Sequence, residues 1–125
     1  MNIQEVLDKV DERRPNSMSR PMKINLIQTL DQKIYEEILL THWHRREEEV
    51  MPHYSDDSDA GTELLVPERY GDVYVYWLLC HIDEQNREMG MYNNDRVLFE
   101  NAYGEMQDWW NRRRMPLSRN RQLWI

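Results

Sequence analysis

The stretch that decides the fold is residues 63–83, ELLVPERYGDVYVYWLLCHID. Its VYVYW core concentrates β-branched and aromatic residues, as β-strands do. Two-fold alternation fails after Trp77, however, because the following LLC is apolar on both faces that a strand would have. The i, i+3, i+4, i+7 spacing of a helix fits better, and it joins Tyr70, Val73, Tyr74, Trp77, Leu78, His81 and Ile82.

Length and boundaries also favour a helix in this stretch. Pro67 suits the first turn of a helix and would interrupt a strand that ran through it. The segment continues for about 20 residues before Gly90, which is long for a strand. We predict that residues 66–86 are mostly helical and form the best-buried element, so that Trp77→Ala costs about 3–5 kcal/mol. The opposite face is apolar too, which places this helix at the centre of a bundle or against another subunit.

Two further helices are predicted before this segment. The first begins after Asn2, a suitable N-cap, and ends before Pro15; its apolar face holds Ile3, Val6, Leu7 and Val10. The second runs from about residue 20 to about residue 42, with Ser19 as its N-cap. Its apolar face holds Ile27, Leu30, Ile34 and Ile38, widened by Leu26, Tyr35 and Leu39. Its solvent face is assigned Lys23, Gln28, Asp31, Gln32, Glu36 and Glu37.

Residues 43–66 break the helical pattern with charge runs, a proline and a Ser/Asp/Gly cluster. Two strand-like pieces, residues 49–54 and 62–66, flank the cluster and allow a small β-hairpin. A loop of this length in a small domain is usually functional. We therefore expect it to project from the bundle as a docking element, and deletion of residues 54–61 to leave the fold intact.

The remaining residues predict a final helix and a tail. Gly90 should end the central helix, and an asparagine cap should start the next, which runs from about residue 95 to residue 113. Its apolar stripe is Leu98, Phe99, Ala102, Tyr103, Met106, Trp109 and Trp110. The chain then divides into a helical domain, residues 1–115, and a tail, residues 116–125. The expected fold is mainly α: a small bundle of about four helices, with a long loop or short β-hairpin between the second and third and an extended C-terminal tail.

Composition narrows the class of protein. The 125 residues are 40% hydrophobic and 31% charged, which is typical of one globular domain. No apolar run approaches the ~20 residues that span a bilayer, and the N-terminal MNIQEVLDKVDERR has charges where a signal peptide is apolar. The net charge of −7 argues against a general binder of nucleic acid or anionic membrane. Five tryptophans and seven tyrosines suggest more than one buried surface, and the single Cys80 excludes an internal disulfide.

The sequence contains no strong motif for metal binding, phosphate binding or catalysis. The four histidines lack metal-ligand spacing, so no metal site is predicted at His42, His44, His53 or His81. Residues 56–63, DDSDAGTE, fail as a calcium loop, because Ala60 and Pro67 take positions that need ligands; they indicate a solvated acidic turn. We find no phosphate loop and no catalytic constellation, and predict neither enzyme activity nor a cofactor.

The arginines near the C-terminus form one basic patch, at residues 112–114, Arg119 and Arg121. Such a patch can contact DNA phosphates. In an otherwise acidic chain it can also pair with the acidic surface of a neighbour, and we favour that interpretation.

Four stretches together resemble one family of proteins. They are VDERRPNSMS, LIQTLDQKIYEEIL, ELLVPERYGDVYVYWLLCHIDEQN and GMYNNDRVLFENAYGEMQDWWNRRRMP. The ELLVPxxY pattern followed by YNN is the most specific part, whereas residues 42–54 fit only loosely. In these stretches the chain resembles the head–tail connector adaptors (neck, or head-completion, proteins) of tailed siphophages and Gram-positive prophages.

The resemblance implies a structural adaptor without catalysis or cofactor. Such proteins form a ring, commonly of twelve copies, beneath the portal, where they extend the DNA channel and carry the stopper and tail. The implied partners are further copies of the chain, the portal protein and a stopper or tail-completion protein. DNA passes without sequence-specific binding, no membrane is involved, and the expected location is the virion neck after synthesis in the host cytoplasm. The alternative is a small helical protein-binding module or phage regulator that acts as a monomer or dimer.

Four sets of residues are inferred for this role. The tail should dock on the portal through Arg119, Arg121, Leu123, Trp124 and Ile125; the alternative is that Trp124 folds back onto its own bundle. The long loop should meet a neighbouring subunit or the next ring through Glu48, Tyr54, Asp56, Asp57 and Asp59. The core or subunit interface should hold Tyr70, Tyr74, Trp77, Phe99, Tyr103 and Trp110. The channel wall should be acidic or neutral so that DNA slides, with candidates Glu5, Asp8, Asp31 and Glu36.

Overall fold

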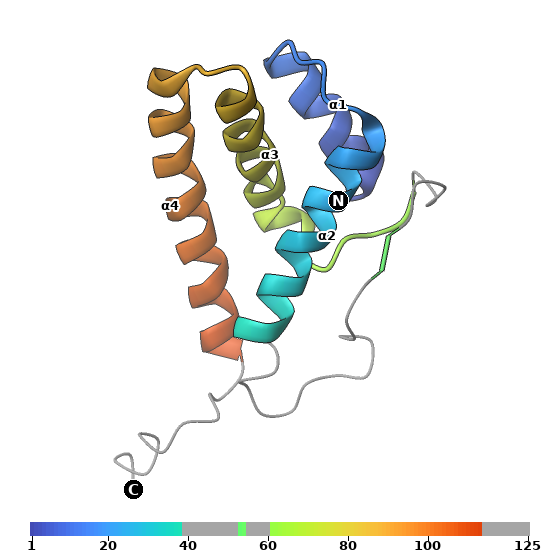
Figure 1. Ribbon diagram of the computed structural model, residues 1–125. Helices are drawn as coiled ribbons and strands as arrows, with labels where there is room; N and C mark the ends of the chain where they lie inside the picture. The colour runs from blue at the N-terminus through green and yellow to red at the C-terminus, as the bar shows by residue number, and fades with distance from the viewer. Residues whose placement is uncertain (39–52, 55–60, 114–125) are drawn as a thin grey trace, which may run out of the picture.

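The predicted mainly α fold is confirmed. A computed structural model describes residues 1–38, 53–54 and 61–113, and in them the chain folds into four α-helices and one short 3₁₀ helix (Figure 1). The elements are α1 (Ile3–Arg13), α2 (Arg20–Glu37), η2 (Glu68–Tyr70), α3 (Asp72–Gln85) and α4 (Met89–Arg113). The predicted tail, residues 116–125, and residues 49–52 of the predicted hairpin lie outside the described residues.

α3 is the central helix, as its two apolar faces predict. It contacts α1, α2 and α4, and it lies alongside α4 over most of its length (Figure 1). Its fully enclosed side chains are Val73, Tyr74, Val75, Leu78, Leu79 and Ile82. The ambiguous VYVYW core is therefore helical, because a run that is apolar all round can be buried by helices on several sides.

The N-caps predicted for α1 and α2 are confirmed, whereas the asparagine cap predicted for the last helix is wrong, because α4 already begins at Met89. The Asn2 side chain accepts a hydrogen bond from the Glu5 N–H at 2.9 Å. The Ser19 hydroxyl accepts one from the Met22 N–H at 3.3 Å, with proline in the first turn of α2. Each cap satisfies a main-chain donor that the helix itself leaves unpaired, and so sets where the helix begins.

The predicted strand-like piece, residues 62–66, pairs with the start of the chain. Asn2 and Glu63 form an isolated antiparallel bridge. The Ile3 N–H donates to the Thr62 carbonyl at 3.3 Å, and the Leu64 N–H donates to the Met1 carbonyl at 3.0 Å. The Met1 side chain packs closely against Gly71, where an added Cβ would lie 2.7 Å from the Met1 sulfur. The segment thus anchors the N-terminus of α1.

The predicted helix break at Gly90 is wrong. α3 ends at Gln85 in a Schellman motif: the Glu88 N–H donates to the Asp83 carbonyl at 2.9 Å and the Arg87 N–H to the Glu84 carbonyl at 3.2 Å. Arg87 takes the left-handed conformation, with φ of 60°, that a glycine usually takes. α4 starts directly afterwards at Met89, so Gly90 lies in its first turn.

Replacing Arg87 by glycine should raise the free energy of unfolding by about 0.5–1 kcal/mol. A left-handed L-residue costs about 1–2 kcal/mol, and the greater freedom of glycine in the unfolded chain offsets part of the gain. Chemical denaturation measures the change. Glu88→Gly, at the next position and without a positive φ, is the control and should destabilise the protein; equal effects of the two changes would contradict the prediction.

Two residues assigned to the solvent face of α2 are instead buried. Lys23 is 6% exposed and donates to the Asp11 carboxylate at 2.5 Å. Asp31 is fully buried. Hydropathy alone predicts that charged residues are exposed to solvent. Here hydrogen bonds with residues on other segments offset the desolvation cost of burying Lys23 and Asp31.

Candidate functional site: a groove between α2 and α4

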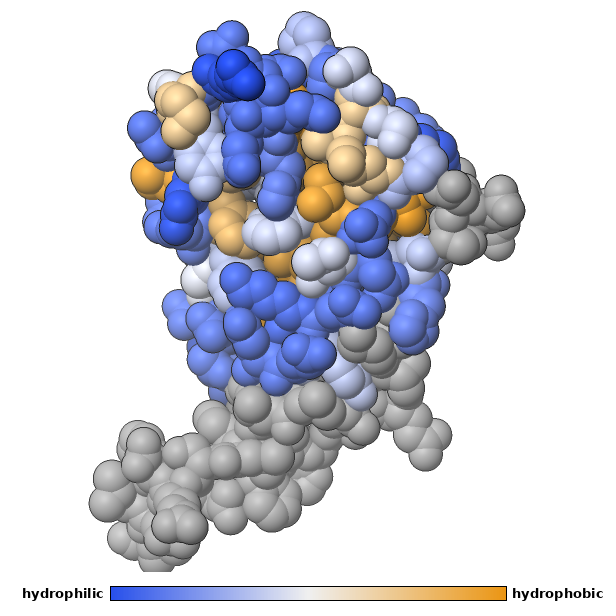
Figure 2. Space-filling view, in the orientation of Figure 1, coloured by the Kyte–Doolittle hydropathy of each residue, from blue (hydrophilic) through white to orange (hydrophobic). Residues whose placement is uncertain are grey.

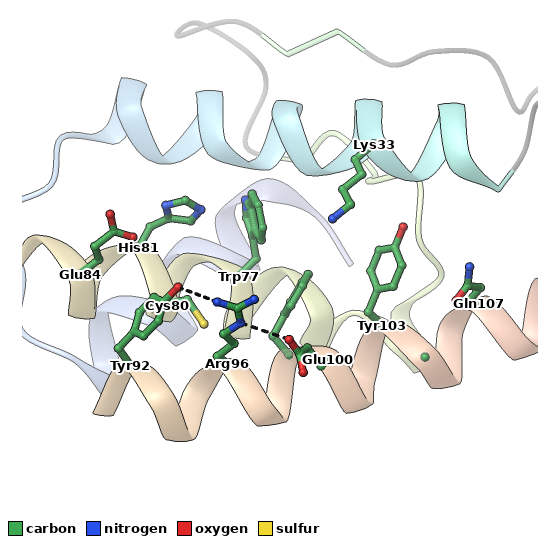
Figure 3. Close-up of a pocket in the computed structure, with 12 residues that line it drawn as sticks. Lys33, Trp77, Cys80, His81, Glu84, Tyr92, Arg96, Glu100, Tyr103 and Gln107 are labelled. Carbon is green, nitrogen blue, oxygen red and sulfur yellow. Dashed lines mark hydrogen bonds and ion pairs between the residues drawn. The ribbon is translucent and has the colours of Figure 1, made fainter. Parts of the chain in front are cut away.

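A groove lies over α3, between α2 and α4, in the described part of the chain (Figure 3). Its volume is about 490 Å³, within the range of ~300–1,000 Å³ that is usual for binding sites. Figure 3 shows side chains from the three helices facing it. The lining residues are Lys33, Trp77, Cys80, His81, Glu84, Tyr92, Arg96, Phe99, Glu100, Tyr103, Gly104 and Gln107.

The floor of the groove is aromatic. The ring centroids of Trp77 and Phe99 are 5.3 Å apart, and those of Phe99 and Tyr103 are 5.7 Å apart. His81 meets the Trp77 ring edge-on at 4.5 Å, and its burial lowers its pKa. The Trp77 indole N–H donates to the Leu26 carbonyl at 2.8 Å, which fixes the ring against α2. Closely packed aromatic rings make this floor rigid as well as apolar.

The rim of the groove is charged and internally paired. Arg96 donates to Glu100 at 3.1 Å and to the Tyr92 hydroxyl at 3.4 Å; these two partners raise its pKa (Figure 3). The Tyr103 hydroxyl donates to Glu37 at 2.9 Å, which joins α4 to the end of α2. The Lys33 ammonium lies 5.5 Å from the Tyr103 ring centroid. Burial, and then the neighbouring carboxylates, raise the pKa of Cys80 to about 11, so its thiol is not activated.

The groove continues into a second hollow of about 300 Å³. The two share His81 and Glu84, and the second adds Met18, Met22 and Leu26. Figure 2 shows apolar patches framed by hydrophilic side chains on the face where α2, α3 and α4 meet. Exposed methionine beside an aromatic floor suits a surface that adapts to apolar side chains.

A second apolar surface lies on the opposite flank of α4. We define this ridge as Met91, Leu98, Ala102 and Trp109, which recur at heptad-like spacing. Met91 is 47% exposed and Leu98 is 38% exposed. Trp109 packs on Tyr70 at 5.5 Å between ring centroids. α4 therefore presents two different apolar surfaces, the groove on one side and the ridge on the other.

A buried polar network holds the groove walls in place. The Tyr74 and Tyr54 hydroxyls each donate to the Asp31 carboxylate at 2.6 Å, and the Tyr74 oxygen accepts the Val66 N–H at 2.8 Å. Burial raises the pKa of Asp31 to about 6, although the hydrogen bonds from the tyrosines oppose the shift. The network joins α2, α3 and the segment before η2.

A second buried cluster joins α1 to α3 and α4. The Arg14 guanidinium contacts Asp83 and donates to Asp95 at 3.0 Å. Asp83 is fully buried and Asp95 is 5% exposed. Burial and the adjacent carboxyl of Asp95 raise the pKa of Asp83 to about 6, while Arg14 opposes the shift. The two carboxylates raise the pKa of Arg14 against the effect of burial.

Both clusters predict that the protein becomes more stable as the pH falls through about 6. Asp31 and Asp83 have folded-state pKa values of about 6, above the ~3.9 of an unfolded aspartate, so the folded state binds more protons between these values. His81 acts in the opposite direction, because burial lowers its pKa, but two aspartates should outweigh one histidine. Urea denaturation at pH 7 and pH 5 should therefore show the higher midpoint at pH 5. Asp31→Asn and Asp83→Asn should each flatten this dependence, whereas Asp8→Asn, on an exposed residue, should leave it unchanged. A lower midpoint at pH 5 would contradict the assignment.

The six aromatic residues predicted for the core or subunit interface divide between the groove, the core and the ridge. Trp77, Phe99 and Tyr103 line the groove, whereas Tyr74 and Trp110 are core residues and Tyr70 lies beside the ridge. Tyr54, predicted to dock, is instead half-buried against the core. Because Tyr54 belongs to the Asp31 network, deletion of residues 54–61 should also weaken the fold.

The other predicted sites divide between exposed positions and positions outside the described residues. Glu5, Asp8 and Glu36 are exposed, so they stay candidates for an acidic channel wall, whereas the buried Asp31 cannot serve. The loop residues Glu48, Asp56, Asp57 and Asp59 lie outside the described residues. So do His42, His44 and the tail residues Arg119, Arg121, Leu123, Trp124 and Ile125.

Sequence reasoning missed several residues of the groove and of its supports. Lys33, Arg96 and Glu100 line the groove. The sequence did not indicate this, because a charged side chain on a helix ordinarily points into solvent. The spacing of Arg96 and Glu100, four residues apart, could have indicated their ion pair. Arg14 gave no local signal, because its partners lie 69 and 81 residues away.

Comparisons with known proteins found no relative of this chain. No protein-family model, curated protein or solved structure matches the chain. Within residues 1–38, 53–54 and 61–113, no three histidine, cysteine or acidic side chains gather so that they could hold a metal ion. None of the helices in those residues has the length and apolar character needed to cross a membrane.

Proposed function

We propose that this protein is a head–tail adaptor subunit of a siphophage or prophage neck, which forms a ring beneath the portal. The ring would extend the DNA channel and provide the platform for the stopper and tail. The resemblance of four sequence stretches supports this role. The mainly helical fold, with a rigid central α3, is compatible with it.

The observation that carries the proposal is the pair of different apolar surfaces on α4. A ring needs a heterologous contact, in which one surface of a subunit meets a different surface of the next. The groove offers a concave aromatic surface, and the ridge offers exposed apolar side chains on the opposite flank. A monomeric protein rarely exposes large apolar surfaces without a binding role.

The ridge gives a matched test of ring assembly. Leu98→Glu places a charge on the ridge and should prevent ring formation on portal particles, because burying an unpaired carboxylate is costly. Val97→Glu is the control: Val97 is adjacent and 56% exposed, but it points away from the ridge. Negative-stain images with portal particles and light scattering of the free protein measure assembly. Rings that form equally well with both variants would contradict the ridge as a contact.

The same measurements separate the proposal from the alternative, a small binding module or regulator. The aromatic groove favours this second candidate, because grooves of this kind receive apolar side chains of a partner. A regulator would stay monomeric or dimeric with portal particles present, and would not bind them. An adaptor should bind the particles and gain mass on them, even if the free protein is a monomer.

A further inference from the structure

The groove opens toward the end of α4, where the chain continues into residues 114–125. Gly104 and Gln107 line the groove, and α4 ends at Arg113. Along a helix, Gln107 lies about 9 Å and Tyr92 about 32 Å before that end. Twelve extended residues span about 40 Å. Residues 114–125 are therefore long enough to return along the whole groove.

The chemistry of residues 114–125 complements the groove and the rest of the chain. The segment contains three arginines and no acidic residue. Residues 1–113 therefore hold 13 basic and 23 acidic side chains, a net charge of −10. The segment also contains Leu117, Leu123, Trp124 and Ile125, large apolar residues that suit an aromatic floor. Opposite charge thus brings the segment to the body of the protein, and the groove can cover its apolar side chains.

We propose that residues 114–125 fold back and occupy the groove of their own chain. In an extended conformation, Leu117 falls at the level of Gly104, Arg119 at the level of Glu100 and Leu123 at the level of Tyr92. The link at Arg113 keeps the segment at a high effective concentration near this groove, which favours it over the groove of another copy.

Paramagnetic broadening in the full-length protein tests the contact. The only cysteine, Cys80, is replaced by alanine, and Ser118→Cys carries a nitroxide label. Trp77 lies in the groove, whereas Trp109 belongs to the ridge on the other flank of α4. The indole N–H signal of Trp77 should lose most of its intensity, and that of Trp109 should keep more. Equal loss at both indoles, or none at Trp77, overturns the proposal.

Two glycines of α4 supply a matched pair of variants. A Cβ added at Gly104 or at Gly90 meets nothing within 4 Å, so a side chain at either position begins in open space. Gly104→Arg fills the groove and repels the arginines of the segment, and it should restore the Trp77 signal. Gly90→Arg adds the same charge and volume outside the groove and should not. Broadening that persists with Gly104→Arg overturns the proposal.

A mixed sample decides whose groove is occupied. Nitroxide-labelled protein without ¹⁵N is mixed with ¹⁵N-labelled protein without nitroxide, at the same total concentration. Occupation within one chain predicts no broadening of Trp77 in the mixture. Broadening there would show that the tail enters the groove of another copy, and it would overturn the intramolecular proposal. Neither result depends on portal binding, so failure of this contact is distinguishable from failure of the adaptor role.

Discussion

Replacing Arg14 by methionine should lower the free energy of unfolding by about 3–5 kcal/mol, the usual cost of removing one partner of a buried ion pair. The change leaves Asp83 fully buried and Asp95 5% exposed, with no cation between them. Methionine keeps the length and most of the apolar volume of arginine, so the loss reports charge more than packing. Chemical denaturation at pH 7 measures the effect.

Two further variants make this result specific. Arg96→Met removes an exposed ion pair with Glu100 and should leave stability nearly unchanged, because surface pairs contribute little. Adding Asp83→Asn to Arg14→Met should recover part of the lost stability, because the stranded charge is then gone. A small effect of Arg14→Met, or no recovery with Asp83→Asn, would show that the cluster does not hold α1 against α3 and α4.

The helices could be predicted because their signals are local. Apolar periodicity, an asparagine or serine before the first turn and a nearby proline all act within one or two turns of the backbone. The end of α3 shows the limit of this reasoning. Gly90 is the residue type that usually ends a helix, yet Arg87 takes the left-handed position, because main-chain hydrogen bonds to Glu84 and Asp83 close the helix there.

The site could be predicted only in part, because it depends on contacts between distant segments. Trp77, Phe99 and Tyr103 are apolar at helical spacing, and the sequence cannot say whether such residues face a core or a groove. That distinction arises from how α2 and α4 are placed over α3. Asp31 is a stronger example: its position on α2 suggests solvent, but tyrosines 23 and 43 residues away enclose it.

Tyr74→Ala should lower the free energy of unfolding by about 3–5 kcal/mol, because it leaves a cavity at the centre of the bundle. Tyr74 is fully buried. Trp77, three residues later, is the aromatic that the sequence singled out for this loss. It is only half-buried and faces the groove, so Trp77→Ala should cost less than Tyr74→Ala. Equal or reversed costs in chemical denaturation would contradict this placement of the core.

Tyr74→Phe separates the hydrogen bonds from the packing. The ring stays, but Asp31 loses a donor and the Val66 N–H loses its acceptor inside the protein. Each buried group left without a partner costs about 1–3 kcal/mol. Tyr54→Phe is the matched control, since it removes an equivalent 2.6 Å bond to Asp31 from a half-buried residue, where water can replace the lost donor. Tyr74→Phe should therefore destabilise the protein more than Tyr54→Phe, and the opposite order would place the centre of the network at Tyr54.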